Sequence, residues 1–180
     1  MIETEQSVTI AADIGTVWTF ARDIRRWAGL MPGMQECEIV DDDNSRWTLK
    51  VGVGGLVRTV RVAVHVEQWD EPEQVLFAYR LEGDPVQGGG SYRAIASGTE
   101  ATEVTLHVRV EGGGPMAPMW EAMGRPLLPQ LAKGFAGQLK AEIEKAAGMA
   151  EQAIPLAAER RSWLARVFDW LRRLWRPAST

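Results

Sequence analysis

The chain has 180 residues, of which 46% are hydrophobic and 24% are charged, a composition typical of one globular domain with some residues left for an appendage. The single cysteine, Cys37, excludes an intrachain disulfide framework, and the net charge of −4 argues against general nucleic-acid binding. Residues 1–10 lack a basic start followed by an apolar run, and no apolar run reaches about 18 residues, so we expect neither a secretory signal nor a spanning helix.

The first elements expected along the chain are a strand at 5–10 and one helix after it. Asp13 is a suitable N-cap for this helix. Apolar side chains then recur at helical spacing at Val17, Trp18, Phe20, Ala21 and Ile24. We expect the helix to reach about Trp27 and to end before Met31-Pro32-Gly33, because proline disfavours helix at the residue before it.

Between residues 36 and 112 the period of the apolar residues changes to two. Clear runs begin at Trp47, Val60, Val75 and Val104, and turns rich in glycine or aspartate separate them. Alternation gives each strand one buried and one solvated face, which favours an antiparallel sheet. Six strands here and the strand at 5–10 make seven.

A helical stretch follows the glycines at 112–114 and runs to about Ala147. Pro126 and Pro129 are expected to break or kink it. Its later part carries apolar residues four apart, at Leu127, Leu131, Phe135, Leu139 and Ile143. The order of elements predicts an α+β domain in which one long helix covers the apolar face of a curved antiparallel sheet.

The chain therefore divides into three predicted parts. Residues 1–147 form the folded domain, the Ala- and Glu-rich residues 148–161 form a tether, and residues 162–176 form a separate amphipathic helix.

A cavity is expected where the long helix crosses the sheet, because one helix cannot fill the space above a strongly curved sheet. Tyr79 and Tyr92 each offer one polar group in an otherwise apolar lining, which is the usual composition of a small-molecule site. A closed core without a ligand is the alternative. The residues expected to line the cavity are Trp47, Leu49, Val64, Phe77, Tyr79, Tyr92, Leu106, Met119, Met123, Leu127, Leu131 and Phe135.

The C-terminal segment differs from the rest of the chain in charge. Six arginines and one aspartate at 160–176 give it a charge of +5, which leaves −9 on the remainder. On a helical wheel its apolar side carries Trp163, Leu164, Val167, Phe168, Trp170, Leu171, Leu174 and Trp175. Its polar side carries Ser162, Ala165, Arg166, Asp169, Arg172, Arg173 and Arg176.

This pattern predicts a helix that lies on an anionic membrane surface, with tryptophans at the boundary between headgroups and acyl chains. Docking on a partner protein or on the chain's own domain is the alternative. The predicted membrane contacts are Trp163, Arg166, Phe168, Trp170, Leu171, Arg172, Arg173, Leu174 and Trp175.

Catalytic and metal-binding signals are weak. His65 and His107 alternate with valines and are expected on the solvated face, and Cys37 has no CxxC partner. The acidic run at 41–44 lacks the spacing of a calcium loop and is interpreted as a hairpin turn. We expect no metal, no covalent cofactor and no enzymatic activity.

The segments that carry a family resemblance are Val8-Thr9-Ile10-Ala11-Ala12, Val17-Trp18, Asp23, Met31-Pro32-Gly33, Lys50-Val51-Gly52-Val53, Gly89-Gly90-Ser91-Tyr92-Arg93-Ala94 and Thr102-Glu103-Val104. In this order, over roughly residues 3–147, the chain resembles the START-like or helix-grip superfamily. Within it, the chain is similar to the carbon monoxide dehydrogenase G-subunit family.

The resemblance implies a non-catalytic partner of a molybdenum CO dehydrogenase at the cytoplasmic face of the bacterial inner membrane. It also implies a bound quinone or other lipid. The alternatives are a membrane-recruitment adaptor without a ligand, and a START-like protein of the lipid-transfer or polyketide-cyclase kind. The cyclase interpretation needs Tyr79 or Tyr92 as an acid or base.

Overall fold

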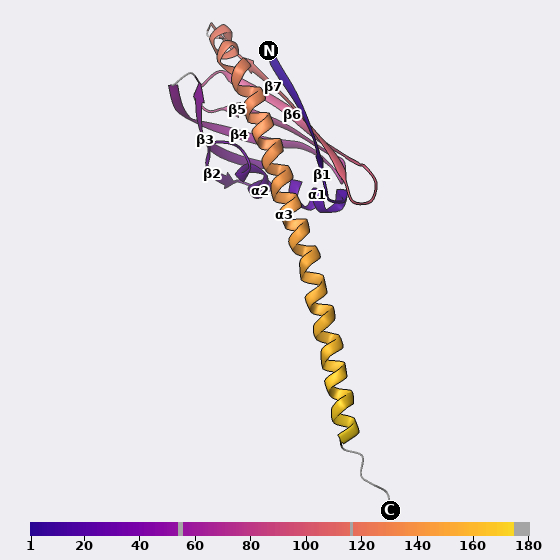
Figure 1. The fold of residues 1–180 in the computed structure, drawn as a ribbon. Coiled ribbons are helices and arrows are strands. Elements are labelled where there is room, and N and C mark those ends of the chain that lie inside the picture. The colour runs from indigo at the N-terminus through magenta and orange to yellow at the C-terminus, as the bar shows by residue number, and fades with distance from the viewer. Residues whose placement is uncertain (54–55, 116, 175–180) are drawn as a thin grey trace, which may run out of the picture. The chain divides into compact units, whose positions relative to one another are not determined.

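A computed structural model describes the backbone of residues 1–53, 56–115 and 117–174, and the side chains of 1–52, 57–115 and 117–148. It contains one seven-stranded antiparallel sheet with the strand order β1-β7-β6-β5-β4-β3-β2 (Figure 1). The strands are β1 (Ile2–Ile10), β2 (Met34–Ile39), β3 (Asn44–Val53), β4 (Leu56–Asp70), β5 (Gln74–Leu81), β6 (Val86–Ala96) and β7 (Thr102–Gly112). The predicted sheet is confirmed.

Two short helices connect β1 at one edge of the sheet to β2 at the other, where one helix was expected. They are α1 (Ile14–Ala21) and α2 (Ile24–Gly29). Asp13 caps α1 as expected, since its carboxylate accepts a hydrogen bond from the Thr16 amide at 3.0 Å. Asp23 accepts one from the Arg26 amide at 3.1 Å. This second N-cap starts a new helix and explains the division.

Burial along the strands follows the predicted alternation. On β4, Val62, Val64 and Val66 are buried, whereas the residues between them face outward. His65 lies on the outer face, where its Nδ1 is 3.0 Å from Asn44 Oδ1. His107 is also on the outer face, 3.4 Å from Glu3 Oε2. Both histidines are therefore outside the domain's interior, as expected.

The long helix α3 runs from Ala117 to Leu174, and its part up to Glu144 lies across the inner face of the sheet (Figure 1). Leu139 and Ile143 of α3 are fully buried. Beside them, Lys140 Nζ donates to the Thr9 carbonyl at 2.6 Å, and Glu144 Oε1 accepts from the Ala11 amide at 2.8 Å. These bonds attach this part of α3 to the end of β1.

The prolines of α3 do not end the helix, in contrast to the expected break. Its assignment continues through Pro126 and Pro129. Each proline removes one hydrogen bond to the carbonyl four residues earlier, here those of Ala122 and Arg125. Gly124 and Met123, in the same stretch, face the sheet and pack along it. Tertiary packing therefore holds this stretch helical despite the lost bonds.

Residues 148–161 are also helical, so the expected tether and the expected separate helix belong to α3. Alanine and glutamate favour helix, which accounts for the difference. The chain divides into two compact units, Met1–Glu144 and Lys145–Thr180. The predicted membrane-facing side chains of 162–176 lie outside the described side chains, and their role stays a prediction. Within the described part of the chain, no helix meets the length and hydropathy needed to cross a bilayer.

Candidate ligand-binding site

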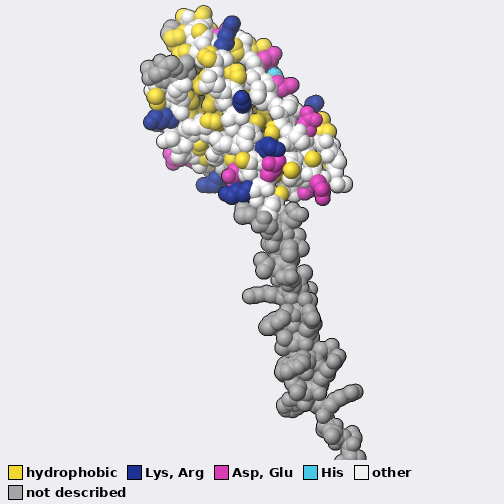
Figure 2. Space-filling model, viewed as in Figure 1, with side chains coloured by type: hydrophobic (Ala, Val, Ile, Leu, Met, Phe, Trp, Pro, Cys, Tyr) yellow, Lys and Arg dark blue, Asp and Glu magenta, His cyan; other side chains and the backbone are white. Residues whose placement is uncertain are grey.

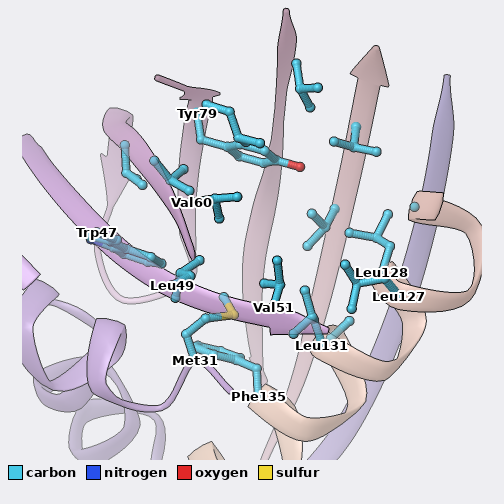
Figure 3. Close-up of a pocket in the computed structure, with 18 of the residues that line it drawn as sticks. Met31, Trp47, Leu49, Val51, Val60, Tyr79, Leu127, Leu128, Leu131 and Phe135 are labelled. Carbon is cyan, nitrogen blue, oxygen red and sulfur yellow. The ribbon is translucent and has the colours of Figure 1, made fainter. Parts of the chain in front are cut away.

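A cavity of about 250 Å³ lies between α3 and the inner face of the sheet (Figure 3). The sheet lines it with Trp47, Leu49, Val51, Arg58, Val60, Val62, Val64, Phe77, Tyr79, Leu81, Val86, Leu106, Val108, Val110 and Gly112. α3 lines it with Trp120, Glu121, Met123, Gly124, Leu127, Leu128, Leu131, Ala132 and Phe135. Trp27 and Met31 complete the lining. Nearly all of these side chains are apolar.

The cavity exists because the sheet contributes short side chains opposite α3. The inner face of β4 carries valines at 60, 62 and 64. The residues of α3 that line the cavity recur three or four apart and so occupy one face of the helix. The valines of β4 leave space that this face of α3 does not fill.

Two glycines of β6 set the positions of two aromatic rings. Gly88 pairs with Tyr79, and a Cβ at Gly88 would lie 2.6 Å from Tyr79 Cζ. Gly90 pairs with Phe77, and a Cβ there would lie 2.9 Å from Phe77 Cζ. Both rings therefore lie across β6 where only glycine leaves room, and both contribute to the cavity wall.

An aromatic cluster forms the wall beside α2. The ring of Trp27 packs edge-on against Phe77 at 5.3 Å, Phe135 at 5.7 Å and Trp47 at 5.9 Å between centroids. Trp27 is buried, and its Nε1 has no hydrogen-bond partner among the described residues. This atom is fully enclosed, so Trp27 contributes its ring to the site and not a donor.

Two polar groups in the wall already have partners within the protein. The Tyr79 hydroxyl donates to the Arg109 carbonyl at 2.8 Å, and Trp47 Nε1 donates to Ser45 Oγ at 2.9 Å. Burial raises the pKa of Tyr79 above its ordinary value, so its hydroxyl stays protonated at neutral pH. The interior is therefore suited to holding an apolar molecule.

The structure brings ten of the twelve expected lining residues together at the cavity. Tyr92 and Met119 are the exceptions, and both expectations are corrected here. Tyr92 is 0% exposed and belongs to the packed core. Met119 is 41% exposed, because the helical phase turns Trp120 and Met123 inward instead.

Sequence reasoning missed several wall residues. Val60 and Val62 share the period-two face of Val64, so that pattern was sufficient to find them. Trp120 lies in the predicted helix, but its helical phase could not be assigned from the spacing alone. Nothing in the sequence indicated that Trp27 approaches Phe135, because this contact depends on how α2 folds back onto α3.

Other candidate chemistry is absent from the described residues. They contain no group of three or more His, Cys, Asp or Glu side chains placed to hold a metal. Burial raises the pKa of the Cys37 thiol, which disfavours the reactive thiolate. Asp41 Oδ1 accepts from the Asn44 amide at 2.8 Å, so the acidic run forms the hairpin turn that was expected.

A family model described as polyketide cyclase/dehydrase and lipid transport matches residues 1–144. The match covers most of the chain, so the chain belongs to this family. No curated protein sequence matches the chain. Family membership and the apolar cavity together indicate an apolar small molecule as the ligand.

Solved structures with this fold include a conserved protein from Geobacillus kaustophilus, with a TM-score of 0.70 and 20% identity over 81% of this chain and 97% of that chain. The Zhui aromatase/cyclase from Streptomyces sp. R1128 has a TM-score of 0.64 and 18% identity over 81% of this chain and 95% of that chain. A START superfamily protein from Mycobacterium smegmatis has a TM-score of 0.59 and 17% identity over 77% of this chain and 97% of that chain. These likenesses confirm the helix-grip fold.

Filling the cavity tests whether it is the binding site. In Leu131→Trp, the larger side chain occupies the space between α3 and β3, so we expect loss of binding of N-phenyl-1-naphthylamine, a neutral apolar dye whose fluorescence rises on burial. Gln130→Trp, at the exposed neighbouring position, is the matched control and is expected to bind the dye like the unmodified protein. Equal dye binding by both variants, at equal melting temperature, contradicts this assignment.

Proposed function

We propose that this protein is a membrane-attached accessory protein that holds a quinone-like molecule and serves a molybdenum enzyme of the CO dehydrogenase type. The observation that carries the proposal is the apolar cavity under α3, which a recruitment adaptor with a filled core does not need. The proposed place of action is the cytoplasmic face of the inner membrane.

The cavity supports a ligand with a flat apolar body. Its volume of about 250 Å³ is slightly below the range for small-molecule sites, roughly 300–1,000 Å³, so the ligand part that it encloses is small. The aromatic rings around Trp27 offer edges and faces for a second ring system. A quinone ring therefore suits the cavity in size and chemistry, with at most a short part of an isoprenoid chain.

Attachment to the membrane is supported by the sequence of 162–176. Arginines on one side and tryptophan, phenylalanine and leucine on the other are typical of a helix at a membrane surface. The partner enzyme is proposed from the resemblance to the CO dehydrogenase G-subunit family over roughly 3–147. The charge of −9 on the chain outside 160–176 offers a surface for electrostatic docking of that enzyme.

A second candidate function is ring-forming catalysis, since the Zhui structure is that of an aromatase/cyclase. Such an enzyme needs an acid or base that reaches the substrate. Tyr79, one of the two candidates from the sequence, is bonded to a backbone carbonyl, and burial raises its pKa. Tyr92, the other, lies in the core outside the cavity. These positions favour binding over catalysis.

The ligand proposal is tested by what the protein retains on purification from a quinone-producing bacterium. We expect organic extraction and mass spectrometry of the intact protein to recover an isoprenoid quinone. Leu131→Trp, purified in parallel, is expected to retain none, which separates cavity-bound quinone from lipid carried on the surface. Repeated recovery of no quinone from the unmodified protein contradicts the proposal.

Membrane recruitment is tested by flotation with anionic liposomes and a purified molybdenum CO dehydrogenase. The full-length protein is expected to float and to carry the enzyme with it, whereas a variant ending at residue 159 is expected to leave both in the dense fraction. If the shortened variant floats equally well, the prediction that residues 162–176 bind the membrane is wrong. If the full-length protein floats without the enzyme, the recruitment role is wrong.

A further inference from the structure

One end of the cavity is formed by Arg58 of β4, the β5–β6 turn and the start of α3. Arg58 lines the cavity, yet its side chain is 49% exposed, so this end opens to solvent. Figure 2 shows hydrophobic side chains gathered around the N-terminal part of α3, with separate basic side chains among them. An apolar ligand that enters here crosses a surface that is itself largely apolar.

Two contacts hold the Arg58 guanidinium in place. Its Nη2 is 2.7 Å from Asp84 Oδ2, and the Asp84 side chain is only 14% exposed. Its Cζ lies 5.6 Å from the centre of the Trp120 ring, which gives a cation–π contact. The guanidinium is therefore fixed at the rim, and the ion pair engages one of its two terminal nitrogens.

The other side-chain donors of the described wall are those of Tyr79, Trp47, Trp27 and Trp120, and Trp120 itself stands at the open end, in contact with Arg58. The Tyr79 hydroxyl and Trp47 Nε1 already have partners, and Trp27 Nε1 is enclosed. An acceptor placed deep in the cavity loses its hydrogen bonds to water and gains none, which is unfavourable. The oxygen of a bound ligand is therefore expected at the open end, within reach of the half-exposed guanidinium.

We propose that Arg58 determines ligand specificity by donating to a carbonyl oxygen of a neutral ligand at the open end of the cavity. This inference rests on the proposed apolar ligand and adds where its polar edge lies. In isoprenoid quinones the chain is attached next to a carbonyl carbon, so a carbonyl at Arg58 also directs the chain out through the open end.

The charges at the open end favour a neutral ligand over an anionic one. Asp84 already neutralises Arg58, and Glu121, which also lines the cavity, is paired with the Met1 amino group. An anionic headgroup either adds a further negative charge beside these carboxylates or displaces Asp84 and leaves it largely buried without its partner. A carbonyl oxygen accepts from the remaining N–H groups and leaves the ion pair intact.

The test compares ligands of matched shape that differ in their oxygens. The probes are 2,3-dimethyl-1,4-naphthoquinone, 2,3-dimethylnaphthalene, which lacks the two carbonyls, and 2-naphthoate, which is anionic. Binding is measured by quenching of tryptophan fluorescence on the full chain. We expect the unmodified protein to bind the quinone more tightly than the other two probes.

The variants separate the role of Arg58 from general effects on the fold. Arg58→Met is expected to weaken quinone binding by roughly tenfold or more, the effect of one hydrogen bond to a charged donor, and to leave 2,3-dimethylnaphthalene unchanged. The double variant Arg58→Met with Asp84→Asn leaves no unpaired buried carboxylate and is expected to show the same selective loss. Arg61→Met, on the outer face of the same strand, is the control and is expected to change neither affinity.

The outcomes distinguish this inference from the proposed function. The specificity role of Arg58 is wrong if both Arg58 variants bind the quinone with the affinity of the unmodified protein. It is also wrong if their affinities for the quinone and for 2,3-dimethylnaphthalene fall by the same factor. In either case the proposed binding of an apolar ligand is not contradicted. Tighter binding of 2-naphthoate than of the quinone overturns the preference for a neutral ligand. If the unmodified protein binds none of the three probes, the proposed function itself is wrong.

Discussion

The packing of α3 on the sheet is the constraint from which the site follows. Near residues 139–144 the helix is held closely, by the burial of Leu139 and Ile143 and by the bonds that Lys140 and Glu144 make to the end of β1. Toward its N-terminus the same helix faces the short valines of β4 across the cavity. Close packing at one end and short side chains opposite the other leave an apolar space between the helix and the sheet.

The buried core and the cavity wall overlap. Ile10, Val17 and Tyr92 are buried and do not line the cavity, whereas wall residues such as Val64 and Phe135 are both buried and part of the lining. The polar groups of the wall differ in what they can offer: the Tyr79 hydroxyl and Trp47 Nε1 donate within the protein, Trp27 Nε1 is enclosed, and Arg58 stands at the rim. An apolar body with one polar edge is the kind of molecule that we propose this arrangement accepts.

Much of the fold follows from the sequence, because its two main patterns are local. Period-two alternation of apolar residues indicates a strand, and the i+4 spacing of apolar residues in α3 indicates a helix. Ten of the wall residues followed from the same patterns. The errors concern features that depend on tertiary contacts or helical phase: Asp23 starts a second helix, Pro126 and Pro129 stay within α3, Tyr92 belongs to the core, and Met119 faces outward. The approach of Trp27 to Phe135 and the Arg58–Asp84 ion pair join residues far apart in the chain, so no local pattern predicts them.

The central claim is that the space under α3 receives a neutral ring-shaped ligand whose polar edge faces Arg58. A crystal structure of the full-length protein grown with 2,3-dimethyl-1,4-naphthoquinone tests this claim most directly. The account predicts ring density between Trp47, Tyr79 and Leu131, with one carbonyl oxygen within hydrogen-bonding distance of the Arg58 guanidinium. An empty or collapsed cavity, or a quinone bound elsewhere on the protein, would contradict it.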